Sequence, residues 1–319
     1  MQYVIGVDGG LTHCVIKAKD MDGHTLAEKK GGTTNHSIVG IKRAGRMVAE
    51  LTSDLLREFN GKRADCKCVV VSATGIDSPR DRLIVEEFYA ALQLPCPIFC
   101  INDGVVALYE ATGGVGMLAI SDAGSIVVGR NKEGVTTRSG GYGLTIMSDE
   151  GSGRWLSIMA LNHMSKWVDG SVPTTPLVEN MISYFHGFDS NKLIQCSNNL
   201  RRHQIKPEIA LMVYQAAEAG DEAAAAILRK GAWELFEVAR TVVRKLGFDH
   251  EQCFLSGMWG SVFQNSALFA DKYKSLFSSE YGNSKLISLD GDGADSAARM
   301  ALDYLNGKVP FIAELYNNS

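Results

Sequence analysis

The sequence predicts an α/β protein of two domains, and three observations support this. The chain has 319 residues, whereas a single domain typically has roughly 150. Short apolar segments typical of buried strands alternate with longer segments of helical periodicity. The strand–turn–strand pattern of residues 3–16 is repeated at residues 117–128. This repetition indicates an internal duplication, in which each domain opens on a β-hairpin carrying an Asp/Gly turn.

In the first half, residues 3–7 form an apolar strand that ends in the turn Asp8-Gly9-Gly10. Residues 14–19 are predicted to form a second extended strand, and Asp22-Gly23 predicts a second hairpin turn. Residues 39–59 have apolar side chains at helical spacing, which predicts a helix. The chain therefore begins with antiparallel strands followed by a helix.

A central strand is expected next. Residues 68–72 are continuously apolar, as in a strand buried on both faces, and Thr74-Gly75 ends the run. A helix over residues 83–92 leads to a short apolar strand at 97–101, which Asn102-Asp103-Gly104 closes. This alternation is typical of strand–helix–strand units with parallel strands.

The second half begins with the repeated hairpin and continues with mainly helical sequence. Helices are expected near residues 151–168, 175–185, 207–219 and 221–246. Two late strands, at 253–256 and 286–289, each run into a glycine-containing turn and then a helix. We expect domains at residues 1–112 and 113–306, with a C-terminal helix near 307–319 completing the first.

The composition excludes several classes of protein. Hydrophobic residues make up 45% and charged residues 21% of the chain, which excludes global disorder and collagen-like repeats. Lys and Arg number 32 against 36 Asp and Glu, for a net charge of −4, which argues against nucleic acid as the main partner. No segment reaches the roughly 18 consecutive apolar residues of a membrane span, and no signal peptide is recognisable.

The seven cysteines are odd in number and include no Cys-x-x-Cys pair, and the seven histidines have no metal-ligand spacing. Neither a disulfide framework nor a zinc site is therefore expected. Unpaired thiols are typical of reducing compartments, so we expect a cytoplasmic protein.

The first candidate loop is Asp8-Gly9-Gly10-Leu11-Thr12. Glycines at a strand end let backbone N–H groups approach an oxyanion closely, and the Thr12 hydroxyl adds a donor. Asp8 can hold Mg²⁺ directly or through water. The alternative is an ordinary hairpin turn, in which Asp-Gly is common. The equivalent turn Ser121-Asp122-Ala123-Gly124-Ser125 recurs in the second half, and this repetition favours a functional role.

The segment Asn102-Asp103-Gly104 follows an apolar strand. Ligands of α/β folds bind at the carboxyl ends of strands, and a carboxylate there can act as general base on a hydroxyl. Asp103 is therefore a candidate general base. The alternative is that it caps the helix over residues 105–110.

Two further glycine-rich segments are candidates. Gly257-Met258-Trp259-Gly260 follows the strand at 253–256 and would let a purine lie against the backbone, or form a simple turn. The segment from Gly140 to Gly153 holds five glycines, Tyr142, Asp149 and Glu150. This composition indicates a loop shaped around a polar ligand, although a capped helix N-terminus is also compatible.

The order of these motifs resembles the N-acetylglucosamine kinase and BadF/BadG/BcrA/BcrD-type ATPase family, within the acetate and sugar kinase, heat-shock ATPase and actin superfold. The resemblance covers residues 3–305, and Thr34-Asn35-His36 and Asp149-Glu150-Gly151-Ser152 are its most specific marks. It implies a two-domain actin-like, ribonuclease-H-like fold. Each domain would be a mixed sheet with flanking helices, and the active site would lie in the interdomain cleft.

The resemblance also implies residue roles. Asp103 would be the catalytic base, and Asp8 and Asp122 would hold the metal. Nucleotide contacts would come from Gly9, Gly10, Thr12, Ala123, Gly124, Ser125 and Gly257. Substrate contacts would come from Asn35, Thr74, Asn102, Tyr142 and Asp149. Gly293-Ala294 loosely matches the last nucleotide-side turn of the family.

The implied activity is ATP-dependent phosphorylation of an N-acetylated amino sugar at its 6-hydroxyl, with Mg²⁺. N-Acetylglucosamine is the first candidate, followed by N-acetylmuramic acid and glucosamine. A homodimer is the expected assembly by resemblance alone. The cysteine pair of the family's dehydratase activators is absent from the sequence, which argues against that branch.

The sequence departs from the family at the second phosphate turn, where Asp122-Ala123-Gly124-Ser125 replaces the usual Gly-Thr-Gly-Ser. Like charges about 4 Å apart repel by about 4 kcal/mol at an effective dielectric constant of about 20, and Mg²⁺ would reverse the sign. Ser148 replaces a usual glycine, and the 141–149 segment is one residue longer than usual. The alternative function is therefore a non-catalytic sugar- or nucleotide-binding sensor with a degenerate phosphate turn.

Overall fold

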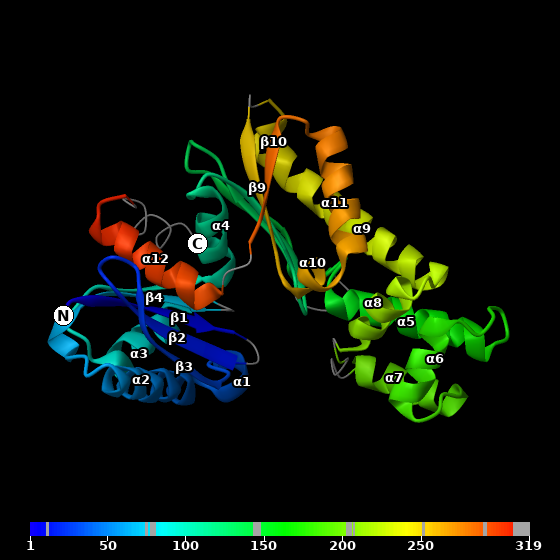
Figure 1. Cartoon of the computed structure of the whole chain (residues 1–319), viewed down its shortest axis with the longest axis horizontal. Coiled ribbons are helices and arrows are strands. Elements are labelled where there is room, and N and C mark those ends of the chain that lie inside the picture. The colour runs from blue at the N-terminus through cyan, green and yellow to red at the C-terminus, as the bar shows by residue number, and fades with distance from the viewer. Residues whose placement is uncertain are drawn as a thin grey trace. The chain divides into compact units, whose positions relative to one another are not determined.

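The computed structural model describes residues 1–10, 13–73, 76, 81–142, 148–201, 206, 208–250, 253–289 and 292–308. The chain forms two compact units (Figure 1). The first comprises Met1–Glu110 with Asp290–Ser319, and the second comprises Ala111–Leu289.

The described part of the first unit contains a mixed sheet of five strands in the order β3-β2-β1-β4-β5. Its strands are β1 (Tyr3–Gly9), β2 (His13–Asp20), β3 (Thr25–Gly32), β4 (Cys66–Ala73) and β5 (Ile98–Asn102). β1, β2 and β3 are antiparallel neighbours, whereas β1, β4 and β5 run parallel. The strands predicted at 3–7, 14–19, 68–72 and 97–101 are confirmed.

Helices cover both faces of this sheet (Figure 1). They are α1 (His36–Val39), α2 (Ile41–Glu58), α3 (Arg82–Leu92), α4 (Asp103–Thr112) and α12 (Gly293–Leu305), with a short 3₁₀ turn at Arg63–Asp65. Alternate residues of β1 point to opposite faces, because the side-chain period of a strand is two. Tyr3, Ile5 and Val7 therefore pack in the core with α2 and α3, whereas Val4 packs in the core with α12.

α12 packs on the sheet at very short range. A Cβ atom on Gly6 of β1 would lie 2.1 Å from the carbonyl oxygen of Ala294 and 2.4 Å from the backbone nitrogen of Ala298. The buried face of α12 is made of small side chains, including Ala297 and Ala301, which are fully buried. Strand backbone and helix backbone are therefore in direct contact.

The division of the chain differs from the sequence-based expectation at one helix. We expected residues up to 306 in the second domain, whereas α12 belongs to the first unit. The alanine-rich face of α12 fits closely against any flat backbone surface, so its pattern does not specify which sheet it covers. The helix expected near 307–319 lies mostly outside the described residues.

The described part of the second unit repeats the topology of the first, with five strands in the order β10-β9-β6-β7-β8. Its strands are β6 (Gly116–Ser121), β7 (Ser125–Arg130), β8 (Thr136–Gly140), β9 (Phe254–Trp259) and β10 (Ser284–Ser288). Again the first strand has antiparallel neighbours on one side and parallel neighbours on the other. The repeated strand pattern of the sequence therefore corresponds to a repeated topology.

The second unit also carries most of the helices. They are α5 (Gly153–Val168), α6 (Pro176–Phe185), α7 (Ser190–Arg201), α8 (Ile209–Glu218), α9 (Glu222–Leu246), α10 (Ser261–Asn265) and α11 (Ala267–Glu280), with a 3₁₀ turn at Phe248–His250. In α9, the side chain of Asp221 accepts from the backbone N–H groups of residues 223 and 224, and Gly247 ends the helix at φ 71°. Leu235 of α9 is fully buried in the core of this unit.

Two elements of the second unit were not predicted. β8 has a polar sequence and partly exposed side chains, and it lies at one edge of the sheet. α7 is also polar over most of its length. Both lack the apolar periodicity on which sequence-based prediction depends.

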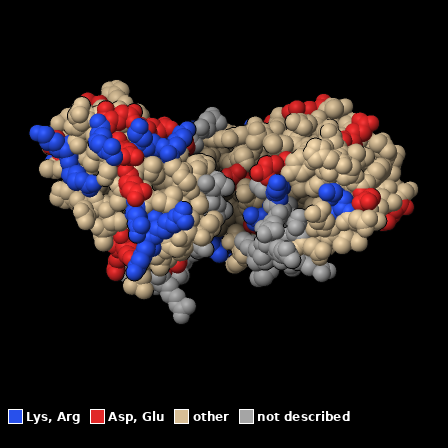
Figure 2. Space-filling model, turned by 90° about the horizontal axis from the view of Figure 1, so that it is seen from below, with Lys and Arg blue, Asp and Glu red and all other residues tan. Residues whose placement is uncertain are grey.

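Two surface properties can be compared with the composition. On the face shown in Figure 2, both positive and negative side chains are visible. α2 carries exposed side chains of both signs, among them Lys42, Arg46, Glu50 and Asp54. Within the described residues, no helix is long and apolar enough to cross a membrane. All seven cysteines are free.

Replacing Gly6 by alanine tests the contact between β1 and α12. The new Cβ would collide with helix backbone, so we expect a loss of about 3 kcal/mol or more in unfolding free energy. In the control Gly282→Ala, the nearest heavy atom to the new Cβ is 3.9 Å away, and we expect a change within about 0.5 kcal/mol. Thermal or denaturant unfolding measures both. Equal stability of the two variants would contradict the close packing.

Candidate active site

The carboxyl ends of three parallel strands meet at one edge of the first sheet. The register pairs Asp8 with Ser72 and Gly9 with Ala73, and Ala73 in turn pairs with Asn102. Asp8 and Asn102 are thus two strand spacings apart, a backbone separation of about 10 Å. Asp103 directly follows Asn102. This edge is where α/β sheets bind ligands, so the first unit brings the predicted metal residue and the predicted base to one place.

The predicted phosphate turn is held by the Thr-Asn loop that follows β3. Thr33 Oγ1 donates to the carbonyl oxygen of Gly10 at 2.8 Å, and the Asn35 backbone N–H donates to Thr33 Oγ1 at 3.0 Å. A Cβ atom on Gly9 would lie 2.8 Å from Thr34 Oγ1. Asn35 is buried beside this turn. The structure therefore joins two motifs that are separated in the sequence.

Asp8 lies among groups that the sequence does not place near it. Burial raises the pKa of the Cys14 thiol to about 12, and the charge of Asp8 adds to this rise. Gly293, the first residue of α12, contacts the Asp8 carboxylate. The loose match of Gly293-Ala294 to a nucleotide-side turn is the only signal in the sequence that pointed to this residue.

Asp103 begins α4 at the end of β5. The Gly104 backbone N–H donates to Asn102 Oδ1 at 2.9 Å and to Asp103 Oδ1 at 2.8 Å. Both side chains thus satisfy a backbone donor at the start of the helix, as the capping alternative requires. Asp103 is also partly exposed at the strand end. Capping and catalysis are compatible here, because the cap fixes the position of a carboxylate that stays accessible.

In the second unit, the Asp122–Ser125 turn is bonded to the start of α5. The Gly153 backbone N–H donates to the Asp122 carbonyl oxygen at 2.8 Å, and the Arg154 N–H donates to the Ala123 carbonyl oxygen at 3.2 Å. The turn is closed by a hydrogen bond of 2.8 Å from the Asp122 N–H to the Gly124 carbonyl oxygen. The position of this turn is therefore fixed by a helix.

Side chains on both sides of the turn bind the Asp-Glu-Gly-Ser segment. Ser121 Oγ donates to the Gly151 carbonyl oxygen, and Ser125 Oγ donates to the Glu150 carbonyl oxygen, both at 2.8 Å. Two loops that the sequence assigned to different ligands, phosphate and sugar, thus form one hydrogen-bonded unit. The short polar side chains of the serines are the only sequence signal of this connection.

Asp149 is turned toward this same hairpin. Its side chain is only 3% exposed, and its backbone has the left-handed φ of 91°. Oδ1 accepts from the Ser125 N–H at 3.3 Å, and Arg154 Nη1 lies 3.5 Å from Oδ2. Burial raises the pKa of Asp149, and Ser125 and Arg154 only partly oppose this. The carboxylate of Asp149 therefore contacts the Asp122–Ser125 turn in this structure.

Asp122, by contrast, is exposed. Its carboxylate accepts a hydrogen bond from the hydroxyl of Ser261, the first residue of α10. Gly260, the residue before Ser261, has φ 114°. A Cβ atom on Gly260 would lie 2.1 Å from the Ser121 carbonyl oxygen. Burial raises the pKa of Tyr214 on α8, and the charge of Asp122 adds to this. Ser261 and Tyr214 were missed, whereas Gly260 belongs to the candidate segment 257–260. A Gly-Ser pair after a strand is a recognisable turn signal.

The turn predicted over residues 257–260 begins at Gly260 and not at Gly257. β9 extends to Trp259 because its pairing with β6 continues, with Leu118 opposite Gly257. A Cβ atom on Gly257 would lie 2.6 Å from side-chain atoms of Ala111 and Leu118. Close packing therefore accounts for this glycine, and Gly260 is the glycine at the strand end.

The remaining predicted residues are placed in part. Tyr142 is exposed, its N–H donates to Ser148 Oγ at 3.1 Å, and the Arg138 guanidinium carbon lies 5.2 Å from the centre of its ring. Thr12 and Thr74 lie outside the described residues, as does the 143–147 segment.

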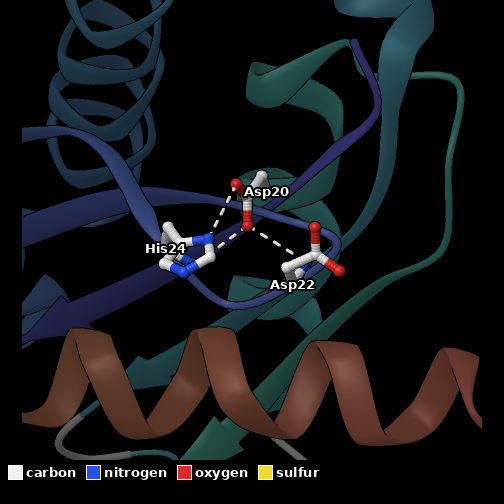
Figure 3. Close-up of side chains that lie close together, drawn as sticks. All are labelled: Asp20, Asp22 and His24. Carbon is white, nitrogen blue, oxygen red and sulfur yellow. Dashed lines mark hydrogen bonds and ion pairs between the residues drawn. The ribbon is translucent and has the colours of Figure 1, made fainter.

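One group of possible metal ligands lies at the opposite end of β2 from this edge. Figure 3 shows Asp20, Asp22 and His24 in the turn between β2 and β3. The backbone N–H groups of His24 and Asp22 both donate to Asp20, and His24 Nδ1 lies 3.2 Å from it. These hydrogen bonds lower the pKa of Asp20. They explain the cluster as a capped turn, so we assign it no functional role.

Each of the two hairpins, taken by itself, carries donors that suit a magnesium nucleotide. Asp8 and Asp122 offer carboxylate oxygens, which are the ligands that Mg²⁺ prefers. Two backbone donors at these turns have partners in this structure: the Gly10 N–H donates to the His13 carbonyl oxygen at 3.0 Å, and the Ser125 N–H donates to Asp149. Gly293 forms a cradle against Asp8 that a larger residue would fill.

Two units of the same strand order, each with an Asp/Gly turn after its first strand, define an actin-like ATPase fold. The chain belongs to the BadF/BadG/BcrA/BcrD ATPase family, whose model matches residues 5–289. Membership of this family implies that the protein uses ATP.

Similar proteins span nearly the whole chain. The N-acetylmuramic acid/N-acetylglucosamine kinase of Clostridium acetobutylicum is 31% identical over 94% of this chain and 98% of its own length. The N-acetyl-D-glucosamine kinase of Dictyostelium discoideum is 27% identical over 95% of this chain and 98% of its own length.

Solved structures confirm the fold. A Chromobacterium violaceum protein assigned as an N-acetylglucosamine kinase matches 95% of this chain and 99% of its own, with a TM-score of 0.74 and 24% identity. A ROK family glucokinase from Streptomyces griseus matches 94% of this chain and 99% of its own, with a TM-score of 0.59 and 15% identity.

The raised pKa of Asp149 predicts the pH dependence of an Asp149→Asn variant. A carboxyl group with a folded-state pKa above its unfolded value loses stability as pH rises through that interval. Asparagine does not titrate. We therefore expect Asp149→Asn to raise the thermal midpoint at pH 7 by about 1 to 4 °C, with the gain vanishing below the unfolded pKa of about 4. A pH-independent difference from wild type would contradict the assigned burial effect.

Proposed function

We propose that this protein transfers the γ-phosphoryl group of ATP to the 6-hydroxyl of an N-acetylated amino sugar. N-Acetylglucosamine is the first candidate substrate, N-acetylmuramic acid the next, and glucosamine the third. The observation that carries the proposal is the alignment of Asp8 and Asp103 at one edge of the first sheet, in a chain whose relatives are amino-sugar kinases.

Phosphoryl transfer needs positioning and neutralisation of charge more than covalent catalysis. In the proposed site, Asp103 accepts the proton of the attacking sugar hydroxyl, and its fixed position at the start of α4 limits the entropy lost on reaction. Asn35 holds the sugar by hydrogen bonds. Asn35 is buried beside the Gly9-Gly10 turn. This burial supports a role for Asn35 in holding the sugar close to the phosphate that is transferred.

Asp8 and Asp122 are the proposed ligands of Mg²⁺, which would neutralise phosphate charge when bound. Gly9, Gly10, Gly124 and Ser125 would provide backbone contacts to phosphate oxygens. The N–H groups of Gly10 and Ser125 donate to His13 and Asp149 in this structure, so they would exchange these partners for phosphate. The acid at Asp122 is compatible with this role because its turn is fixed by α5 and its carboxylate is exposed and hydrogen-bonded by a hydroxyl.

Asp149 and Tyr142 complete the proposed sugar site. Asp149 faces the Asp122–Ser125 turn through Oδ1 in this structure. A sugar hydroxyl would bind its carboxylate at Oδ2, beside Arg154, or in exchange for Ser125. Such an exchange would connect occupancy of the sugar site to the geometry of the phosphate turn.

The activity can be measured as ADP release from Mg-ATP with single sugars. We expect sugar-dependent release with N-acetylglucosamine and N-acetylmuramic acid, weaker release with glucosamine, and little with glucose. Absence of any sugar-dependent ADP from folded protein would contradict the kinase proposal. Calorimetric binding of ATP without turnover would then favour the sensor function that the unusual Asp122-Ala123 turn suggested.

The role of Asp103 predicts the kinetics of an Asp103→Asn variant. Removal of a general base lowers kcat by about 10²- to 10⁴-fold, whereas asparagine preserves the acceptor that caps α4. We expect sugar binding, measured by calorimetry, to be retained. The matched control is Asp54→Asn on the exposed surface of α2, which should keep wild-type turnover. A kcat near that of wild type for Asp103→Asn would exclude the residue as base.

A further inference from the structure

The N-terminus of α12 lies directly against the carboxylate of Asp8. Gly293 is the first residue of α12. A Cβ atom at this position would lie 2.7 Å from Cγ of Asp8, and 2.8 Å and 3.0 Å from its two carboxylate oxygens. Real Cβ atoms do not approach other groups so closely. Asp8 and a side chain at position 293 therefore cannot both occupy their present places.

Local backbone preference does not explain this glycine. The backbone of Gly293 does not have a positive φ. Gly293 begins a regular helix whose N-cap is Asp292. Alanine is more favourable than glycine at a helical position. The space that the Asp8 carboxylate occupies is therefore the physical reason for glycine here.

An ion-pair cluster fixes the same end of α12 to the sheet. Lys17 Nζ on β2 lies 2.6 Å from Asp292, 2.9 Å from Asp295 and 3.2 Å from Glu28, and its side chain is only 9% exposed. Lys19 lies 2.8 Å from the other oxygen of Asp295. Burial alone would lower the pKa of Lys17, but the bonds to Asp292 and Asp295 outweigh it and raise the pKa. Lys17 therefore stays charged at neutral pH.

Lys17 and Asp8 point to the same face of the sheet. The register of β1 and β2 pairs Gly6 with Lys17 and Asp8 with Val15. Paired residues of antiparallel strands share a face, and so do residues two apart in one strand. This is the face that α12 covers, with its backbone in contact at Gly6. Lys17, the start of α12 and Asp8 thus form a continuous chain of contacts.

We propose that Gly293 and Lys17 are positioning residues for Asp8. Lys17 holds the N-cap Asp292, and Gly293 then provides a surface without a side chain against which the carboxylate is oriented for Mg²⁺. The positive end of the helix dipole also favours an ionised carboxylate at this place. The proposal rests on the proposed function, in which Asp8 is a ligand of Mg²⁺.

A double-mutant cycle tests the contact independently of any activity. Thermal unfolding is measured for wild type, Asp8→Ala, Gly293→Ala and the double variant. We expect Gly293→Ala to lower the midpoint when Asp8 is present, and to leave it unchanged or raise it in the Asp8→Ala background. Gly282→Ala, whose new Cβ has no close neighbour, should have no effect in either background. The same shift for Gly293→Ala in both backgrounds would overturn the proposal.

Metal affinity tests the positioning role. The Mg²⁺ dependence of ATP binding is titrated by calorimetry for each folded variant. Loss of a residue that orients a metal ligand typically weakens metal binding by about 10- to 100-fold, and we expect this for Gly293→Ala and Lys17→Gln. Lys17→Arg should restore most of the affinity, because it keeps the charge. Binding of the sugar alone should not change.

The outcomes distinguish failure of the positioning role of Gly293 from failure of the proposed kinase function. An unchanged Mg²⁺ dependence in Gly293→Ala, with wild type binding Mg-ATP, would overturn the positioning role and leave the proposed function intact. Failure of wild type itself to bind Mg-ATP would overturn the proposed function, and with it a role toward Mg²⁺. The unfolding cycle would then still decide whether Asp8 requires glycine at position 293.

Discussion

The first unit depends on the direct contact of two backbones, that of α12 and that of β1. The contact exists because Gly6 has no side chain and the facing residues of α12 are alanines. Close approach brings the start of the helix to the strand end, where Asp8 lies. A single packing constraint thus connects the core between the sheet and α12 to the surroundings of the proposed metal residue. It brings residues from the beginning and the end of the described chain together at Asp8.

In the second unit, the corresponding turn after the first strand is positioned by hydrogen bonds and not by close backbone packing. Its turn at Asp122–Ser125 is held by backbone N–H groups of α5 and by the side chains of Ser121 and Ser125. Asp149 is buried against this turn at a cost that its raised pKa reflects. A buried carboxylate of this kind, with a left-handed backbone, is typical of functional sites rather than of residues selected for stability. The unusual acid at Asp122 is then tolerated because it is the exposed member of the turn.

Much of the fold could be predicted from the sequence, because buried parallel strands such as 68–72 are continuous apolar runs and the two hairpins repeat. The candidate residues at strand ends followed from the same logic, and register places Asp8 and Asn102 at one edge. Contacts between distant segments could not be predicted. The alanine face of α12 does not indicate which sheet the helix covers. The sequence around Gly257 does not distinguish a glycine required by close packing from a glycine required by a turn. Polar elements such as β8 and α7 were not predicted, because their sequences have no hydrophobic periodicity.

We propose that this family member phosphorylates the 6-hydroxyl of an N-acetylated amino sugar. The most direct measurement is phosphorus NMR of the product formed from Mg-ATP and N-acetylglucosamine, with correlation to the sugar protons. We expect one phosphomonoester coupled to the two protons on carbon 6, formed in equal amount to ADP. Inorganic phosphate alone, or a phosphoryl group coupled to the anomeric proton, would contradict it.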